Sequence, residues 1–207
     1  MRDPGMIGAA FIAAIGVAAV AAPAFAGDTL TTLASFNGTN GTAPWPSAGL
    51  ILSGGTLYGT TSVGGADGYG TVFSLPVTGG PVTTLASFNV TNGAWPQAGL
   101  TLSGGTLYGT TDAGGAYGYG TLFSVPITGG TPTTLLSFNT GNSSGPTYYG
   151  NLTLSGNTLY GTAYQGGAYG DGTVFAITIP EPASWALLAV SAAAGLLLLR
   201  RRRCTKV

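Results

Sequence analysis

Residues 53–61, Ser-Gly-Gly-Thr-Leu-Tyr-Gly-Thr-Thr, return unchanged at residues 103–111. The first eight occur a third time at 155–162, where Asn157 replaces the second glycine. Self-similarity at intervals of 50 and 52 residues is typical of repeat proteins, in which each copy is one supersecondary unit. Paired glycines supply the positive φ angles of tight hairpin turns, and Thr and Tyr favour strands. The sequence therefore predicts three copies of a β-hairpin.

Flanking motifs extend each copy to about 50 residues. Gly-Thr-Val-Phe at 70–73 returns at 120–123, with Leu for Val, and at 172–175. Leu-Ala-Ser-Phe-Asn at 33–37 returns at 85–89 and, with one change, at 135–139. In the first copy we expect strands at 49–52, 56–61, 71–77 and 82–88, with a glycine loop at 64–70 between the second and third. No helical periodicity is present between residues 27 and 179.

The repeats begin and end out of phase. The body starts with a fourth-type strand at 29–36 and ends with a third-type strand at 173–179. The simplest use of this permutation pairs the N-terminal strand beside the last repeat, which would close the array and hide two strand edges. Six apolar residues are expected to be buried: Leu57, Phe73, Leu107, Phe123, Leu159 and Phe175.

Four-stranded repeats of this length are typical of β-propeller blades. The predicted fold class is therefore all-β, with three tandem four-stranded repeats arranged like propeller blades, plus one C-terminal transmembrane helix. Known propellers usually have four to eight blades, so other arrangements stay open. The alternatives are a β-trefoil-like or prism-like arrangement, a compact three-sheet unit, and half of a dimeric ring.

Charged residues are scarce and unevenly placed. Only 6% of the 207 residues are charged, there is no His, and there is one Cys. Residues 27–179 contain no Lys or Arg and four acids, which are Asp28, Asp67, Asp112 and Asp171. A body without cations cannot neutralise phosphates, which argues against nucleic acid and anionic headgroups as partners. The composition also excludes a Ser-His-Asp triad, histidine metal ligands, an internal disulfide and a zinc-cysteine cluster.

The first 26 residues are typical of a secretory signal peptide. Arg2 precedes an apolar run at 6–20, and Ala24-Phe25-Ala26 is a small-x-small cleavage site. The mature chain is therefore expected to begin at Gly27, and the alternative is an uncleaved membrane anchor.

The C-terminal segment has the pattern of a membrane span. Residues 183–199 form an uncharged run of 17 residues. This length is near the shortest that crosses a bilayer. Four arginines follow, and positive charge stays on the cytoplasmic side, so the repeats would lie outside. A buried soluble helix is the alternative. The cluster consists of Arg200, Arg201, Arg202 and Arg203.

Pro180-Glu181-Pro182, an apolar helix and an arginine cluster at the chain end together resemble the PEP-CTERM protein-sorting domain. The resemblance implies that residues 180–207 are a recognition signal for an exosortase, a membrane-embedded protease-transpeptidase. It further implies export through the secretion machinery and transient anchoring in the membrane. Removal of the tail at the cell surface would follow, in a bacterium that makes exopolysaccharide.

The repeat itself resembles the GloVer tandem repeat. The resemblance rests on residues 57–61, Gly64-Gly65, residues 70–73 and the Pro46-x-x-Gly49-Leu50 pattern. In the third copy, Tyr148 and Asn151 stand where Pro46 and Gly49 stand in the first. No activity is established for that family, so the resemblance implies a location and not a reaction.

The acids do not form a repeated site. Asp67, Asp112 and Asp171 all fall between a second and a third strand, but no Asp occupies the same repeat position twice. They are either a Ca²⁺ site or carboxylate pair, or solvated loop residues of the kind that favour turns. We favour the second interpretation, and we predict no catalytic residue, no metal and no cofactor.

The segments after Phe36, Phe88 and Phe138 vary in length and carry aromatic residues. Variable segments at one repeat position map to one face, often the binding face. Aromatic rings among amides and hydroxyls suit sugars, whereas the alternative is that the tryptophans fill the joints between sheets. The candidate glycan-binding residues are Trp45, Trp95, Tyr148 and Tyr149, with amides from Asn37, Asn40, Asn89 and Asn92.

The sequence thus predicts an exported, exosortase-sorted cell-surface or extracellular-matrix protein. Its repeat module is expected to be non-catalytic, with exopolysaccharide as a candidate ligand. The alternative is a secreted carbohydrate-active hydrolase on the same scaffold. The scarcity of ionisable groups favours the first hypothesis, because general acid–base catalysis needs such groups.

Overall fold

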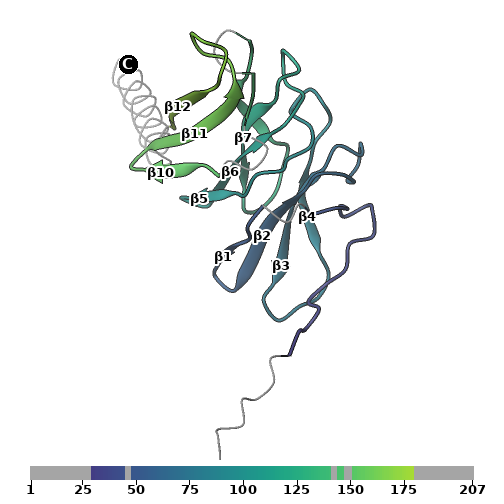
Figure 1. The fold of residues 1–207 in the computed structure, drawn as a ribbon. Helices are drawn as coiled ribbons and strands as arrows, with labels where there is room; N and C mark the ends of the chain where they lie inside the picture. The colour runs from purple at the N-terminus through teal and green to yellow at the C-terminus, as the bar shows by residue number, and fades with distance from the viewer. Residues whose placement is uncertain (1–28, 45–47, 141–143, 147–150, 180–207) are drawn as a thin grey trace, which may run out of the picture. The chain divides into compact units, whose positions relative to one another are not determined.

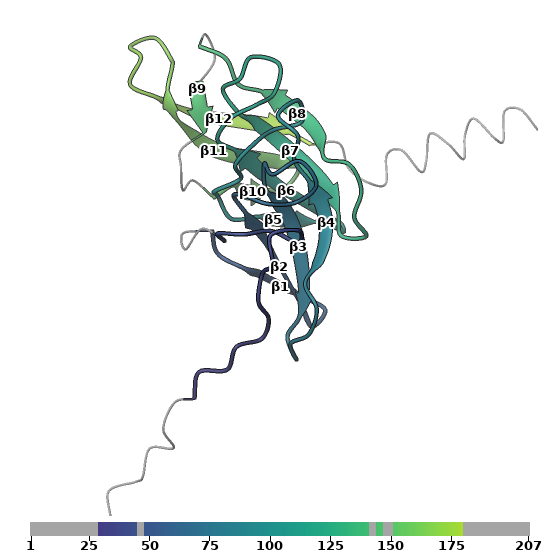
Figure 2. The same ribbon diagram turned by 90° about the vertical axis from the view of Figure 1, so that its right-hand side faces the viewer.

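A computed structural model describes residues 29–44, 48–140, 144–146 and 151–179. The chain divides into two compact units, and all the elements below belong to the second, Thr32–Val207. Every regular element assigned to the described residues is a β-strand, as Figures 1 and 2 show. The strands form three four-stranded antiparallel sheets, which confirms the all-β prediction and the division into repeats.

Each sheet is built from one sequence copy. In sheets 1 and 2 the strands are hydrogen-bonded in chain order, and in sheet 3 the order is β10-β11-β12, with β9 also on β11. Sheet 1 holds β1 (Ile51–Ser53), β2 (Thr56–Thr61), β3 (Thr71–Pro76) and β4 (Thr83–Ser87). Sheet 2 holds β5 (Thr101–Ser103), β6 (Thr106–Thr111), β7 (Thr121–Pro126) and β8 (Thr133–Ser137). Sheet 3 holds β9 (Ser144–Pro146), β10 (Thr153–Ser155), β11 (Thr158–Gln165) and β12 (Thr173–Thr178).

The glycine of the Leu-Tyr-Gly-Thr motif has a packing function. Gly109 on β6 is the cross-strand partner of Phe123 on β7, and the other two copies repeat this pairing. A Cβ atom on Gly109 would lie 2.7 Å from Cζ of Phe123. The phenylalanine ring therefore occupies space that only a glycine leaves free. In the hairpin of sheet 1, Gly54 and Gly55 have φ angles of 55° and 75°, as the paired-glycine turn requires.

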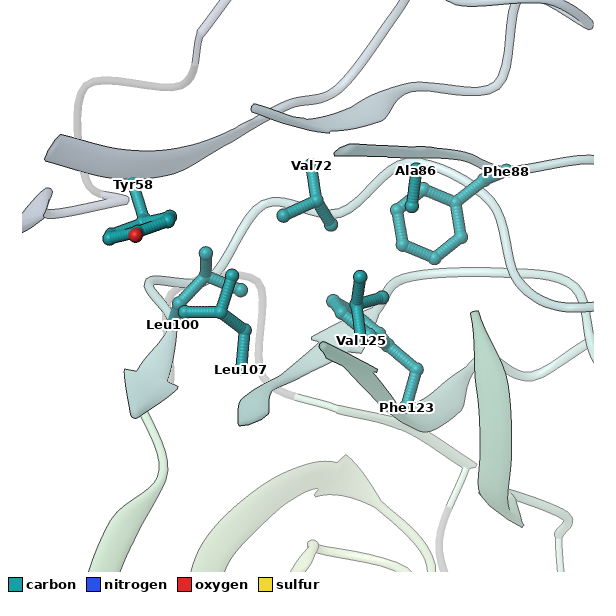
Figure 3. Close-up of a cluster of buried hydrophobic side chains, with 8 residues drawn as sticks. All are labelled: Tyr58, Val72, Ala86, Phe88, Leu100, Leu107, Phe123 and Val125. Atoms are coloured by element: carbon teal, nitrogen blue, oxygen red, sulfur yellow. The ribbon is translucent and has the colours of Figure 1, made fainter. Parts of the chain in front are cut away.

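Consecutive sheets pack face to face. Figure 3 shows four side chains of the first copy pointing toward four of the second. The rings of Phe88 and Phe123 meet edge to face across this interface, with centroids 4.9 Å apart. The first group is Tyr58, Val72, Ala86 and Phe88, and the second is Leu100, Leu107, Phe123 and Val125.

The interface between sheets 2 and 3 repeats this arrangement. Phe138 follows β8 and packs on Phe175 of β12, with ring centroids 5.3 Å apart. The buried cluster contains Tyr108, Leu122 and Phe138 from the second copy, and Leu152, Leu159 and Ile179 from the third. Sheet 2 is consequently covered on both faces, which is why the burial of β6 does not alternate.

The predicted closure by the N-terminal strand is wrong in this structure. Residues 29–36 form no strand, and no strand in the described part pairs with the outer edge of β12. Instead, the carbonyl of Leu33 accepts a hydrogen bond from the amide of Gly80, at 3.1 Å. The ring of Phe36 packs edge to face on Phe73, at 5.1 Å. Phe36 thus contacts sheet 1 as Phe88 contacts sheet 2, and the array of sheets is open.

Four of the six residues expected in the core are buried: Phe73, Leu107, Phe123 and Leu159. The expectation is wrong for Leu57 and Phe175, which are half-buried. Leu57 lies on the face of sheet 1 that no preceding sheet covers. Phe175 packs against the second buried cluster from its margin.

The predicted export and sorting segments lie outside the described residues. They comprise the signal peptide at 1–26 with Ala24, Ala26 and Gly27, the Pro180-Glu181-Pro182 motif, the helix at 183–199 and the arginines at 200–203. In the part of the chain that the structure describes, no helix is long and apolar enough to span a membrane.

Candidate functional site

Of the four aromatic residues predicted to contact a sugar, only Trp95 lies within the described part of the chain. It sits on the segment that joins β4 to β5, and 43% of its surface is exposed. The other three candidates, Trp45, Tyr148 and Tyr149, lie outside the described residues.

Trp95 is paired with a tyrosine from the preceding repeat. Tyr69 comes from the glycine loop between β2 and β3, and its ring centroid lies 6.5 Å from that of Trp95. The amide of Trp95 donates a 3.0 Å hydrogen bond to the carbonyl of Tyr69. Because Tyr69 also packs against the first buried cluster, the aromatic pair is fixed to the core.

The backbone at Trp95 has a conformation that is rare for a bulky residue, with a φ angle of 56°. Hydrogen bonds hold it there, because the amide of Asp112 donates to the carbonyl of Trp95 and Ala94 pairs with Ala113. In the first copy, Ala43 has a φ angle of 47° and its carbonyl accepts from the amide of Ser62. The repeat therefore requires this backbone conformation whichever side chain is present, and the indole of Trp95 is not needed to produce it.

The backbone pairing corrects the sequence alignment of the copies. Three bridges are equivalent: Thr42 with Val63, Ala94 with Ala113, and Ser144 with Gln165. They make Ala43, Trp95 and Gly145 equivalent, and likewise Pro44, Pro96 and Pro146. The prediction that Tyr148 replaces the proline of the third copy is therefore wrong, because Pro146 holds that position. The extra residues of the first and third copies follow this proline, so Trp45 is not the counterpart of Trp95.

The asparagines of these segments stabilise the loop itself. Oδ1 of Asn89 accepts from the amide of Asn92 and the hydroxyl of Thr91, and Oδ1 of Asn92 accepts from the amide of Asn89. Asn37 and Asn40 form the same pattern in the first copy. These amide oxygens, expected to face a sugar, are thus engaged in hydrogen bonds within the loop.

A buried pair of threonines ties this loop to sheet 2. The hydroxyls of Thr111 and Thr121 lie 2.9 Å apart, and both residues are fully buried. Thr121 Oγ1 also donates to the carbonyl of Asn92, at 3.2 Å. Since buried hydroxyls need partners, this network fixes the loop three residues before Trp95.

The family described as the Gloeobacter/Verrucomicrobia repeat matches residues 20–195, which include all twelve strands. The chain belongs to this repeat family. The match confirms the resemblance to the GloVer repeat. A search of curated proteins finds no match to the chain.

Within this Gloeobacter/Verrucomicrobia repeat protein, sequence reasoning missed Tyr69 as the partner of Trp95. Tyr69 gave no signal, because Tyr119 occupies the same position in the second copy and marks it as a repeat feature. Spacing along the chain places Asp112 in the loop after the second strand of its copy but does not indicate its backbone hydrogen bond to Trp95. Gln97, two residues after Trp95, has a buried Oε1 without a hydrogen-bond partner among the described residues.

Burial raises the pKa of Asp112 above the ordinary value for aspartate, about 4. A raised pKa in the folded state means that folding disfavours the charged form. The contribution of Asp112 to the free energy of unfolding is therefore largest below the pKa of this residue in the unfolded chain. It falls as the pH rises through the higher pKa of the folded state.

We expect Asp112→Asn to be more stable than the wild type at pH 7, by less than about 1 kcal/mol because solvent screens the half-buried group. The difference in stability should vanish near pH 3, where the aspartic acid of the wild type is protonated and therefore neutral, like the asparagine of the variant. Urea unfolding at the two pH values tests this. A variant that is less stable than the wild type at pH 7 and equal to it at pH 3 would show that the carboxylate has a stabilising partner.

The acids of the repeats are dispersed. In the described part of the chain, no group of three His, Cys, Asp or Glu side chains could hold a metal ion. Asp67 and Asp171 lie on the glycine loops of the first and third copies, whereas Asp112 follows β6. The site at Trp95 thus consists of two aromatic rings, Trp95 and Tyr69, with Asp112 joined to Trp95 through the backbone.

Proposed function

We propose that this protein is an exported, non-catalytic surface or matrix protein that binds polysaccharide through the site at Trp95. Its three sheets are taken to be propeller-like blades, and the segments between them carry the ligand-binding groups. The observation that carries the proposal is the half-exposed Trp95, held in a rare backbone conformation and paired with Tyr69.

The chemistry of the site suits a neutral or basic sugar. An indole face packs on the C–H groups of a pyranose ring, and a few polar groups then fix its orientation. The carboxylate of Asp112, whose backbone amide bonds the Trp95 carbonyl, can accept a hydrogen bond from a sugar hydroxyl. Because residues 29–179 contain no Lys, Arg or His, an acidic ligand would meet no opposite charge there.

Trp95→Ala is expected to weaken binding to exopolysaccharide by about ten-fold, because loss of one aromatic contact costs about 1–1.5 kcal/mol. Ala43 shows that the repeat accepts alanine at this backbone position, so the variant should fold normally. A pull-down on the polysaccharide of the producing cells measures retention. Tyr117→Ala, which removes a more exposed aromatic ring from the glycine loop of the second copy, is the matched control.

Retention on a neutral polysaccharide should change little with salt, since a neutral sugar forms no ion pair that salt could screen. Equal retention of wild type and Trp95→Ala would remove this site from the proposal. Retention that falls steeply with salt would point to a charged contact elsewhere in the chain.

Export and sorting form the second part of the proposal. Residues 1–26 are taken as the signal peptide, and residues 180–207 as a PEP-CTERM tail read by an exosortase in the membrane. The repeat domain would be anchored outside the membrane and then reach the cell surface or the matrix. Support comes from the order of the motif, the apolar run and the arginines.

Mass spectrometry of the exported protein is expected to show a chain that starts at Gly27 and ends near residues 180–182. Glu181→Gln should leave the tail attached and the protein in the membrane fraction. Exported protein that retains Arg200 to Arg203 would contradict the sorting proposal.

A secreted glycan hydrolase is the second candidate, favoured only by the raised pKa of Asp112. A carboxyl with a raised pKa can act as a general acid, but glycoside cleavage usually needs a second carboxylate at a set separation. If the protein turns over a glycan, Asp112→Asn should abolish turnover, because an amide cannot act as a general acid. Absence of turnover by the wild type favours the binding function.

A further inference from the structure

The sheets at the two ends of the array each have one uncovered apolar face. We define the front face of a sheet as the one that packs on the preceding sheet, and the back face as the one that packs on the following sheet. On the front face of sheet 1, Leu50 is 57% exposed, whereas the equivalent Leu100 and Leu152 are 6% exposed. The difference arises because Leu50 has no preceding sheet to cover it.

The back face of sheet 3 shows the complementary vacancy. Val174 is 79% exposed, whereas the equivalent Val72 and Leu122 are completely buried. Tyr160 is 42% exposed, against 7% for Tyr58 in sheet 1. Burial alternates along β11 and β12, as expected for a sheet that is packed on one side only.

The front face of sheet 1 also carries a preformed groove. Phe36, Leu50, Phe73 and Leu75 line a cavity of about 290 Å³, together with Ala34 and Pro44. The carbonyl of Leu33 accepts a 3.1 Å hydrogen bond from the amide of Gly80, in the turn after β3. In the same way, the carbonyl of Leu85 in β4 accepts a 2.9 Å hydrogen bond from the amide of Gly130, in the turn after β7. Residues 32–36 therefore hold the place, relative to sheet 1, that β4 holds relative to sheet 2.

Among the described residues, sheet 3 has no strand in the position that β4 occupies in sheet 1. β4 pairs with β3 and β8 pairs with β7, but in the described part of the chain nothing pairs with the same edge of β12. A sheet docked in front of sheet 1 would place its third strand beside residues 32–35. Residues 32–35 of one chain and the outer edge of β12 in another would therefore form a strand pair like the pair of β4 and β3.

We propose that the back face of sheet 3 in one copy of this chain packs on the front face of sheet 1 in a second copy. Residues 32–35 of the second copy then add a fourth strand to the sheet of the first. The two inner interfaces supply the template, because they join these same faces twice within one chain. Two copies joined at both ends give a ring of six sheets, within the range of known propellers, and such a contact between unlike faces is the kind that closes into rings.

The proposal fixes the register of the new strand pair. Val72 is the partner of Ala86, and Leu122 is the partner of Leu136. By the same register, Val174 of one copy lies opposite Ala34 of the other. Cross-strand Cα atoms are about 4.5–5.5 Å apart, which suits a disulfide.

Two full-length chains, one with Ala34→Cys and the other with Val174→Cys, are co-expressed and oxidised gently. Cys204 is replaced by serine in both, so that each chain carries a single thiol. We expect a reductant-sensitive dimer that links position 34 to position 174. In the control, Tyr169→Cys takes the place of Val174→Cys. Tyr169 is 93% exposed, and the equivalent Tyr117 is still 60% exposed although its sheet is covered on both faces, so position 169 should lie outside the proposed interface. The dimer should form about ten-fold less with this control thiol.

A second measurement does not depend on a disulfide. Val174→Asp should reduce the sedimentation mass of the extracted full-length protein from two chains to one, whereas Val63→Asp, at a 44% exposed valine, should leave it unchanged. A wild type that sediments as a single chain would overturn the proposal. So would equal cross-linking of positions 174 and 169, because it would indicate random collision rather than docking.

Discussion

Replacing Phe123 with alanine is expected to lower the free energy of unfolding by about 3–5 kcal/mol, the usual cost of truncating a buried phenylalanine. Phe123 is completely buried, contacts Phe88 edge to face and lies over Gly109. It belongs to the interface between sheets 1 and 2, so its loss affects two repeats. Among the described side chains of the first interface, no other combines complete burial with these two contacts.

Urea unfolding of the wild type and of Phe123→Ala measures the difference. Tyr169→Ala, which truncates an aromatic ring that is 93% exposed, is the control and should change stability by less than about 0.5 kcal/mol. A loss below about 1 kcal/mol for Phe123→Ala would mean that the sheets are not held together by this contact.

Gly109→Ala is expected to cost about 1–3 kcal/mol, although alanine in a strand is ordinarily better than glycine by about 0.5–1 kcal/mol. The added Cβ would lie 2.7 Å from Cζ of Phe123 and 3.0 Å from Cδ2 of Leu100. The sign of the change is therefore diagnostic, because propensity and packing predict opposite directions.

Gly49→Ala provides the matched control, since a Cβ there would have nothing within 4 Å. It should be neutral or slightly stabilising. Combining Gly109→Ala with Phe123→Leu should recover part of the loss, because a smaller side chain opposite the new methyl relieves the clash. Additive losses in the double variant would locate the strain elsewhere.

Most of the fold could be predicted from the sequence because the repeats mark their own boundaries. The paired glycines locate the hairpin turns, and alternating apolar residues locate the strands. The fate of residues 29–36 could not be predicted in the same way. Residues 31–36 repeat residues 83–88 without a change, but a strand exists only where an edge is available to pair with it. Whether that edge belongs to the same chain is a property of the assembled sheets.

The site was only partly predictable for a different reason. Trp95 was identified from its loop, but its partner Tyr69 belongs to the repeat before it, and their contact follows from how the two copies pack. The proline-rich stretch also misled the alignment, because Pro44 and Pro46 both fit the pattern and only the bridge between Thr42 and Val63 distinguishes them. A side chain's neighbours across a repeat boundary are not encoded by spacing along the chain.

The sequential packing of the sheets also bears on how such genes change. Every inner interface joins the back face of one copy to the front face of the next, with the same phenylalanine contact each time. A copy inserted by duplication would meet both neighbours with faces they already accommodate, and a deleted copy would leave two matching faces behind. Unequal recombination between the near-identical 50-residue segments can therefore lengthen or shorten the array in whole units without requiring any new interface to evolve.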